Sequence, residues 1–228
     1  MKRSKSIQNA YAKIDRIKKY PLSEAIKLMQ ELSTVKFDPT AEIHFSLGID
    51  PRHADQQVRS TISLPHGIGK SVKVVVFCSD DKIKEAKAAG AIDAGSADLI
   101  DKVLSKGWTD FDVAVSTPSM MKELAKAARV LGPKGLMPNP KAGTVTDDIE
   151  KVVQELVAGR LEFRNDKTGI VHTVFGKLSF GDKKLLENLE AMIKAVKEAK
   201  PTGSKGEYIK TVTINSTMGA GIKIDISY

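Results

Sequence analysis

The apolar residues of this chain follow two different spacings, and the spacing changes twice along the sequence. In EIHFSLGID (42–50) and GIKIDIS (221–227) apolar and polar residues alternate, as in half-buried antiparallel strands. KVVVF (73–77) and FDVAV (111–115) are continuous apolar runs, which are typical of strands buried on both faces of a parallel sheet. The chain is therefore expected to build two kinds of sheet.

The alternating segments cluster toward the two ends of the chain. VRSTISLP (58–65), GIVHTVFG (169–176) and YIKTVTIN (208–215) add candidate strands, and STMGA joins YIKTVTIN to GIKIDIS in a predicted hairpin. PLSEAIKLMQEL (21–32) and DKKLLENLEAMIKAVKEAK (182–200) have apolar stripes at helical spacing. These two helices suit one face of an antiparallel sheet.

The middle of the chain reads as alternating strands and helices. Helices are predicted over DDKIKEAKAAG (80–90), from Thr117 as N-cap to Gly132, and from Asp147 onward, and AIDAG (91–95) is a possible short strand. We therefore predict an α/β fold with two domains. Residues 1–66 and 160–228 form a discontinuous α+β domain with an antiparallel sheet covered by helices, and residues 67–159 form an inserted, Rossmann-like three-layer α/β domain. The crossings near 64–70 and 158–160 would act as a hinge.

Charge follows the same division. Gly67–Gly159 contains 13 lysines and arginines against 13 aspartates and glutamates, whereas the flanks contain 23 against 15 and so carry the whole net charge of +8. A basic footprint confined to one part of a chain indicates a polyanionic partner there, with nucleic acid first. A basic surface that serves only solubility is the alternative.

Several functional classes lack their motifs. GIGKS (67–71) ends like a phosphate-binding loop, but Leu64 stands where the first glycine belongs and a strand follows instead of a helix. The four histidines lack metal-ligand spacing, and Cys78 lies in an apolar run typical of a buried hydrophobe. No apolar run could span a membrane, and the basic N-terminus lacks the apolar core of a signal peptide, so a cytoplasmic protein without metal or cofactor is expected.

Three flank segments are candidates for RNA contact, because the low aromatic content of 5% argues against a stacking platform. They are TVKFDPT (34–40), RNDKTGIVH (164–172) and STMG (216–219). Each has a structural alternative: Phe37 as core, RNDKTG as a hairpin turn with Gly169 at positive φ, and TMG as a plain loop.

LGPKGLMPNPKAGTV (131–145), together with KFDPTAEIHFSLGIDPRHADQQVRSTISLPHGIGK, GRLEFRNDKTGIVH and the late TMG, resembles the bacterial family of the first-numbered protein of the large ribosomal subunit, the L1 ribosomal proteins. The resemblance covers essentially the whole chain. It implies a monomer when free, with a domain assembled from both chain ends and a second one inserted, and no catalysis. The proline-rich segment itself falls in the neutral insert, where Lys134 and Lys141 leave open a contact with tRNA or stalk RNA.

The resemblance also implies partners and activities. Such a protein belongs to the mobile stalk of the large subunit, binds a helix-and-loop element of its ribosomal RNA and assists release of exit-site tRNA. It further implies translational repression through the leader of the protein's own mRNA. A nucleotide-binding α/β enzyme that uses the insert is the alternative.

The RNA-contacting residues that the resemblance implies all lie in the basic, discontinuous domain. They are Lys36, Phe37, Thr40, Glu42, Arg164, Asp166, Lys167, Thr168, His172, Thr217, Met218 and Gly219. Lys36 and Lys167 suit phosphate neutralisation, whereas the threonines and the backbone at Met218 suit 2′-hydroxyls and base edges. Asp166 would accept from a hydroxyl or hold a neighbouring lysine.

Overall fold

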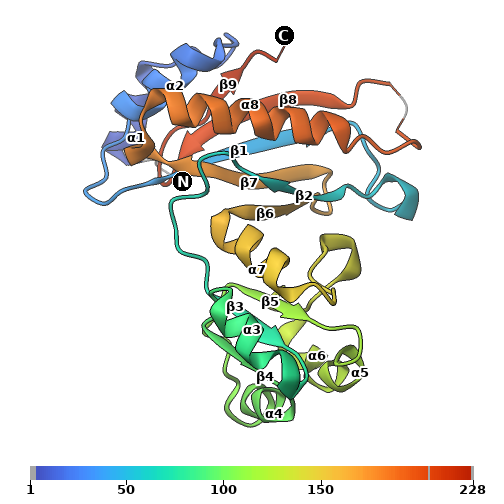
Figure 1. Cartoon of the computed structure of the whole chain (residues 1–228). Coiled ribbons are helices and arrows are strands. Elements are labelled where there is room, and N and C mark those ends of the chain that lie inside the picture. The colour runs from blue at the N-terminus through green and yellow to red at the C-terminus, as the bar shows by residue number, and fades with distance from the viewer. Residues whose placement is uncertain (1–3, 205, 227–228) are drawn as a thin grey trace. The chain divides into compact units, whose positions relative to one another are not determined.

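The computed structural model describes residues 4–204 and 206–226, and its internal contacts define two compact units (Figure 1). One unit combines the chain up to Gly69 with the chain from Glu162 onward, and the other is Lys70–Leu161. The mixed α/β class predicted from the sequence is confirmed. Independent folding of two domains, and a hinge between them, stay predictions.

The first unit is built on a four-stranded antiparallel sheet in the order β7-β1-β8-β9. Its strands are β1 (Thr40–Leu47), β7 (Ile170–Lys177), β8 (Ile209–Ser216) and β9 (Ile222–Ile224). The hairpin predicted at STMGA joins β8 to β9, and Ser227 of the predicted last strand lies outside the described residues. The sheet therefore combines one strand from the N-terminal part of the chain, β1, with three strands from the C-terminal part.

Buried and partly exposed residues alternate along β1, so one face of this sheet is apolar and the other is mainly polar. Along β1 every second residue is buried, and Ala41, Ile43 and Phe45 are fully so. Their face is covered by α2 (Leu22–Glu31) and α8 (Asp182–Glu198), which contact each other as well as the strands (Figure 1). Removing these side chains from water stabilises the layer, and the opposite face keeps its polar residues. The first unit also contains α1 (Lys5–Ala12) and the short 3-10 helices η1 (Ala54–Gln56) and η5 (Leu178–Phe180).

A separate two-stranded sheet pairs β2 (Arg59–Ser63) with β6 (Arg160–Arg164). Strand β6 was not predicted, because RLEFR is mostly charged and buries only Phe163. The predicted turn with Gly169 at positive φ is present, with φ at 79°. It does not close a regular hairpin, since β6 and β7 belong to different sheets and only an isolated bridge joins Asn165 to Val171.

A buried asparagine on α8 ties the segment after β2 to the first unit. Asn188 is fully buried; its side-chain nitrogen donates to the carbonyls of Phe175 (2.8 Å) and Gly67 (3.1 Å), and its oxygen accepts from the backbone of His66 (3.1 Å). Every polar atom of this amide thus has a partner, as burial requires.

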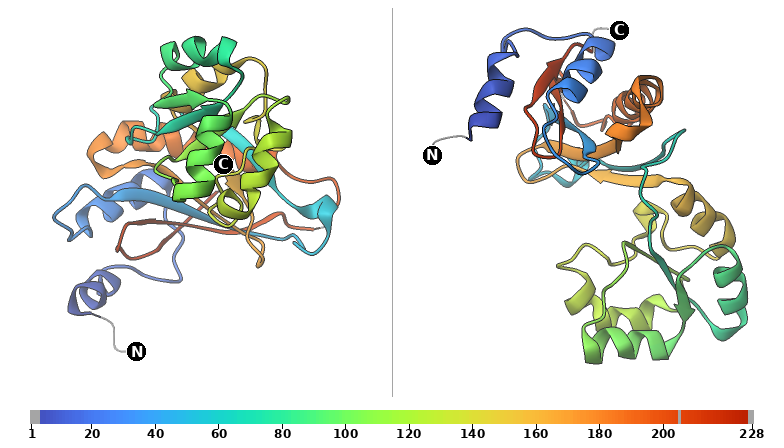
Figure 2. Two further views of the ribbon diagram at one scale, coloured as in Figure 1. Left: turned by 90° about the horizontal axis from the view of Figure 1, so that it is seen from below. Right: turned by 90° about the vertical axis from the view of Figure 1, so that its left-hand side faces the viewer.

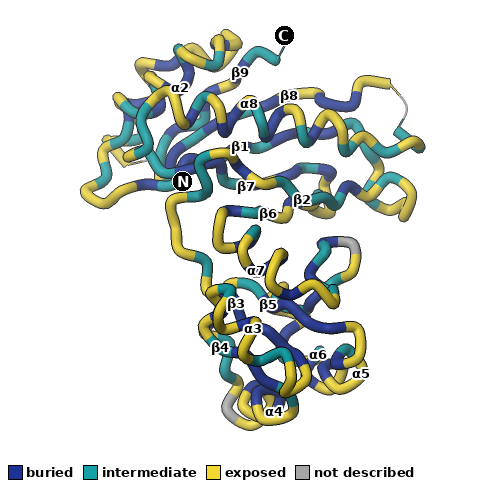
Figure 3. The backbone as a smooth tube through the Cα atoms, in the orientation of Figure 1, coloured by how far each residue is buried: buried dark blue, intermediate teal, exposed yellow. Residues whose placement is uncertain are grey.

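The second unit is a parallel sheet between two helical layers (Figure 2). Its strands β3 (Val74–Phe77), β4 (Asp93–Gly95) and β5 (Val113–Ser116) lie in the order β4-β3-β5, and β3 is buried along its whole length (Figure 3). Val74 and Val76 pack against α3 (Ile83–Ala88) and α7 (Ile149–Ala158). Val75 and Phe77 pack toward α4 (Ala97–Lys106) and the segment of α5 (Met121–Leu124), η3 (Ala125–Ala127) and α6 (Ala128–Leu131).

Two details of the second unit differ from the sequence prediction. The helix expected from Thr117 begins at Met121, because the Met120 N–H bonds to the Thr117 carbonyl (3.1 Å) and closes a turn first. Helix α3 is likewise preceded by the 3-10 turn η2 (Asp80–Lys82). No helix in the part of the chain that the structure describes is long and apolar enough to cross a membrane.

The proline-rich stretch after α6 is an ordered connector. It includes η4 (Pro140–Ala142), and Val145 bridges to Ser116 beside β5. The Thr144 hydroxyl accepts from the backbone of Asn139 (2.8 Å). Lys134 donates to the hydroxyl of Thr109, and the side chain of Lys141 lies outside the described part.

Candidate nucleic-acid interface

The outer surface of the four-stranded sheet is mainly polar, with two apolar residues of β7, Ile170 and Val174, paired to Ser46 and Glu42 on the same side. Residues paired across antiparallel strands lie on the same side, so the register aligns His172, His44, Thr213 and Lys223 across all four strands. We define the polar face by its strand residues Thr40, Glu42, His44, Ser46, His172, Thr211, Thr213, Asn215 and Lys223. All of them are half-buried or exposed, whereas most of their sequence neighbours, such as Ile43, Val171 and Ile214, are buried in the core.

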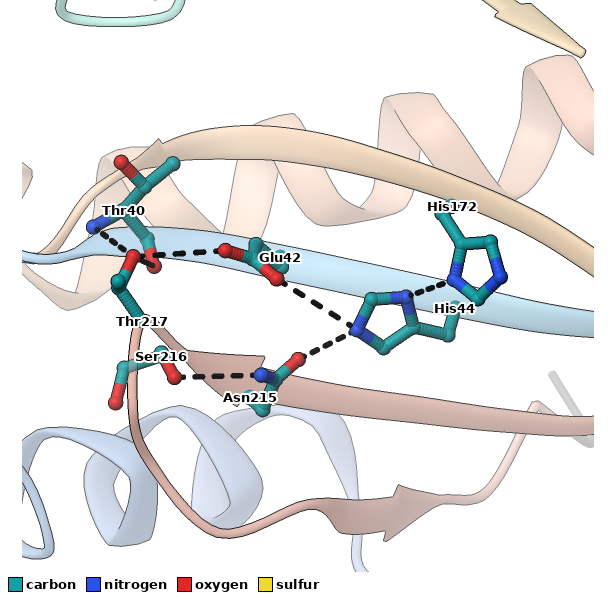
Figure 4. Close-up of polar contacts among 7 residues, drawn as sticks. All are labelled: Thr40, Glu42, His44, His172, Asn215, Ser216 and Thr217. Atoms are coloured by element: carbon teal, nitrogen blue, oxygen red, sulfur yellow. Dashed lines mark hydrogen bonds and ion pairs between the residues drawn. The ribbon is translucent and has the colours of Figure 1, made fainter.

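The turn between β8 and β9 closes one end of the polar face. The Thr217 N–H donates to the Thr40 carbonyl (3.0 Å), and the Thr217 hydroxyl accepts from the Thr40 N–H (3.2 Å). The same hydroxyl lies 3.5 Å from a carboxylate oxygen of Glu42 (Figure 4). Gly219 fits only without a side chain, since a Cβ there would lie 2.3 Å from the Ser216 hydroxyl.

Met218, at the tip of this turn, combines two unusual features. It is the non-glycine residue with positive φ (62°) among the described residues, and 75% of it is exposed. Both features cost free energy in an isolated protein, because a side chain is crowded in the left-handed region and the thioether stays in water. Strain and exposure together are typical of a binding residue.

The loop before β1 lies next to that turn through Thr40. Phe37 is 53% exposed and Lys36 is exposed, so the interpretation of Phe37 as core is wrong. Asp38 fixes the loop by accepting from the hydroxyl (2.8 Å) and the N–H (3.2 Å) of Ser179. The Lys177 ammonium bonds to the Thr40 hydroxyl (2.8 Å). The loop thus presents a cation and an aromatic ring from a fixed base.

The turn from Asn165 to Gly169 is organised by one carboxylate. Asp166 accepts from the N–H groups of Thr168 and Ile170, both at 2.8 Å, and from the Thr168 hydroxyl. The bond from the Ile170 N–H, followed by those from Thr168, holds the pKa of Asp166 below its usual range. Asp166 therefore acts on Thr168 and the backbone rather than on the neighbouring Lys167.

The predicted site residues form two groups. Lys36, Phe37, Thr40 and Glu42 lie around the turn of Thr217, Met218 and Gly219. Asp166, Lys167, Thr168 and His172 lie at the turn before β7 and on that strand, and Arg164 is exposed on β6, outside the four-stranded sheet. Lys36, Lys167 and Lys223 form no ion pair with a carboxylate within the described ranges, which leaves their charges available to phosphate.

A chain of polar contacts joins the two groups through His44, which the sequence analysis left out of the site (Figure 4). His44 Nδ1 lies 2.8 Å from Nδ1 of His172, and His44 Nε2 lies 2.6 Å from Oδ1 of Asn215. Glu42 and Asp166 stand 3.8 Å from the outer nitrogens of the two rings. The alternation of apolar and polar residues along β1 placed His44 on the polar side of the strand. Its hydrogen-bond partners, His172 and Asn215, belong to β7 and β8, so β1 alone gave no sign of them.

The sequence motifs examined for nucleotide, metal or nucleophile chemistry do not form such sites in the described residues. After GIGKS the chain enters β3 without an intervening helix, and Lys70 pairs with Asp112 at 2.8 Å, an interaction that lowers the pKa of Asp112. The described residues contain no cluster of histidine, cysteine or carboxylate side chains suited to a metal ion. Cys78 is buried, and desolvation raises the pKa of its thiol, so it lacks the character of a nucleophile.

Comparison with known proteins gives a consistent result along the chain. The sequence model described as "Ribosomal protein L1p/L10e family" matches residues 29–220. The chain is also similar to the large ribosomal subunit protein uL1 of Macrococcus caseolyticus (strain JCSC5402). The two are 53% identical over 226 residues, which cover 99% of this chain and 97% of the relative.

Proposed function

The chain belongs to the ribosomal protein L1 family, a family of structural rather than enzymatic proteins, and we propose that it binds large-subunit ribosomal RNA through the polar face and the loops at its ends. The observation that carries this proposal is Met218, an exposed residue held at positive φ beside the polar face. The proposed site comprises the predicted residues together with His44 and Asn215.

The chemistry of the site suits RNA. Lys36 and Lys167 supply positive charge for phosphates, and Phe37 and Met218 supply apolar surface for a base or a ribose. The half-buried hydroxyls and imidazoles can read 2′-hydroxyls, which donate and accept hydrogen bonds. The site offers fixed polar groups over a sheet rather than a row of aromatic rings, so it would recognise RNA shape more than a run of bases.

Assembly into the large subunit at its mobile stalk, help in releasing exit-site tRNA, and repression through the leader of its own mRNA are further proposals that rest on the family. Repression would use the same face, because one set of hydrogen-bonding groups can accept two RNAs of the same local shape. Competition between ribosomal RNA and the mRNA leader for the protein would test this.

A single substitution tests the proposed site. Met218→Gly keeps the backbone free to adopt φ near 62° and removes only the side chain, so loss of binding reports the lost contact rather than a distorted turn. We expect its affinity for a large-subunit ribosomal RNA transcript to fall about tenfold, near 1.4 kcal/mol. Ile17→Ser, at another exposed apolar residue of the same unit, serves as the control. Equal binding by wild type and Met218→Gly would contradict the proposal.

A further inference from the structure

The hydrogen bonds around Asn215 determine where the protons of His44 lie. The side-chain nitrogen of Asn215 donates to the Ser216 carbonyl (3.3 Å), which directs Oδ1 toward His44 (Figure 4). Because that oxygen only accepts, His44 Nε2 must carry a hydrogen and donate to it across 2.6 Å. In a neutral His44 the other ring nitrogen, Nδ1, then holds a lone pair.

That lone pair determines the tautomer of His172. The two Nδ1 atoms are 2.8 Å apart, so one must donate and the other accept, and His172 is the donor. Neutral His172 therefore has its free lone pair on Nε2, the nitrogen 3.8 Å from Asp166. A proton added to the pair goes to this Nε2, because the other three ring nitrogens already take part in hydrogen bonds.

A second added proton has no place in this arrangement. It would have to occupy Nδ1 of His44, where two N–H groups would then face each other across 2.8 Å. The two rings meet edge to face with centroids 4.9 Å apart, so they are in direct contact as well as hydrogen-bonded. The histidine pair is thus a site for one proton.

Charged and neutral polar groups of the neighbouring elements face the pair. Glu42 lies on β1 and Asp166 on the turn before β7, while β8 contributes the neutral Asn215 and Thr213. The nearest cation in this row of the sheet is Lys223 on β9, beyond Thr213. Two carboxylates thus flank two imidazoles, and without the added proton this part of the polar face is negative.

We propose that RNA binding is coupled to uptake of one proton by the His44–His172 pair, with His172 Nε2–H donating to a phosphate oxygen and His44 positioning that ring. This inference rests on the proposed RNA-binding function. The His172 side chain is 55% exposed and can reach a ligand, whereas His44 is 27% exposed and acts through its neighbour. A bare Nε2 lone pair repels a phosphate, and the added proton converts it into a charged donor.

The test uses the full chain and a large-subunit ribosomal RNA transcript. Affinity is measured at constant ionic strength from about pH 5.5 to 8.5, the range in which histidine side chains ordinarily titrate. Calorimetry in two buffers of different ionisation enthalpy counts the protons taken up on binding. Wild type is expected to take up as much as one proton, with affinity rising as pH falls by up to about tenfold per pH unit.

Two variants locate the proton. His172→Gln places a permanently neutral N–H donor near the position of Nε2, so it is expected to bind RNA more weakly than wild type at low pH and to lose this proton uptake. His53→Gln is the matched control, because His53 is also an exposed histidine 3.9 Å from a carboxylate, that of Asp50, but lies outside the polar face. It is expected to keep the full uptake. Cooperative unfolding of each variant verifies that it is folded.

The role of His44 is tested by nitrogen NMR of the His172 ring. His44→Asn keeps an acceptor near Nδ1 and should preserve the Nδ1–H tautomer of neutral His172, whereas His44→Leu should lose that preference. Wild type that binds RNA equally at every pH without buffer-dependent heat would overturn the inference and leave RNA binding intact. Equal loss of uptake in His53→Gln would overturn it as well. Absence of RNA binding at every pH would instead overturn the proposed function.

Discussion

Thr217 and Thr40 are 177 residues apart in the sequence and are joined by hydrogen bonds of both backbone and side chain. The Thr217 hydroxyl accepts from the Thr40 N–H at 3.2 Å and lies 3.4 Å from the Thr40 carbonyl. This pair fixes the turn that carries Met218 to the start of β1, where the loop of Phe37 ends. Two segments with no proximity in sequence thereby form one end of the proposed RNA site.

Replacing Thr217 by valine should loosen the turn against β1, because it removes the hydroxyl contacts and keeps only the backbone bond to the Thr40 carbonyl. The Thr40 N–H would lose its acceptor in a partly buried position, and we expect the free energy of unfolding to fall by about 1 kcal/mol. RNA affinity should fall as well, since the turn is then held to β1 by one hydrogen bond fewer. Urea unfolding and filter binding measure the two effects. Thr202→Val, at an exposed threonine, should change stability by less than about 0.5 kcal/mol, and equal effects of both variants would contradict the role of the hydroxyl.

Gly219→Ala should disturb the same turn by crowding. Its Cβ would lie 2.3 Å from the Ser216 hydroxyl and 2.9 Å from the Ser216 carbonyl oxygen, so backbone must move. We expect a loss of about 1 to 3 kcal/mol in the free energy of unfolding, together with weaker RNA binding. Gly221→Ala is the matched control, because its Cβ would meet only a methyl group of Thr213, at 3.1 Å. A greater loss for Gly221→Ala would contradict this account.

Lys36→Gln and Lys167→Gln should each flatten the dependence of RNA affinity on salt. Neutralising a single-strand phosphate contributes a slope of about 0.7 in log K against log salt, and a duplex phosphate about 0.9. Binding measured at several salt concentrations gives the slope for each variant. Lys84→Gln, at an exposed lysine on α3 of the second unit, should leave it unchanged. An unchanged slope for both site variants would mean that neither lysine touches phosphate.

Asp166→Asn should reduce stability in a pH-dependent manner. The folded-state pKa of Asp166 lies below its unfolded value, so its contribution is complete above the unfolded pKa and is lost as pH falls through the folded one. The difference in unfolding free energy between wild type and variant should therefore shrink on acidification below about pH 4. Asp112 is the control, because its carboxyl pKa is also lowered, chiefly by Lys70. Asp112→Asn should show the same pH dependence of the unfolding free energy and leave RNA binding unchanged. If the difference in unfolding free energy between wild type and Asp166→Asn grew as the pH fell, the stabilising role of the ionised Asp166 carboxylate would be refuted.

Replacing Lys70–Leu161 by a flexible glycine–serine linker should leave RNA binding largely intact, because all proposed contacts lie in the first unit. Circular dichroism establishes whether the shortened protein folds, and filter binding then gives its affinity. A folded first unit without specific RNA binding would show that the second unit supplies essential contacts.

The local pattern of apolar and polar residues predicted those features of the fold that depend only on residues close in sequence. The alternation of Ile43 and Phe45 with Glu42 and His44 correctly gave the two faces of β1, because side-chain direction in a strand follows from position alone. Strand β6 was missed, since its charged residues are held by pairing with β2 rather than by burial. The start of α5 was misplaced because Thr117 forms a turn instead of capping a helix.

The chain of contacts through His44 could not be predicted from one sequence. Its partners, His172 and Asn215, lie 128 and 171 residues away. Pairing of this kind depends on which strands are neighbours and on their register, which local periodicity does not specify. The sequence pattern did place all three residues in candidate strands, so a known strand order would have been enough to find it.

The register of β1 against β7 and β8 has a consequence for quality control in the cell. The same alternation that buries Ile43 and Phe45 displays Glu42 and His44, so a slip of one residue would reverse both faces at once. A chain whose proposed RNA-binding surface was damaged in this way would also lack a core and be open to proteolysis. The register of β1 thus couples the core to the proposed RNA-binding surface, so a copy in which the register has slipped would lose stability and RNA binding together.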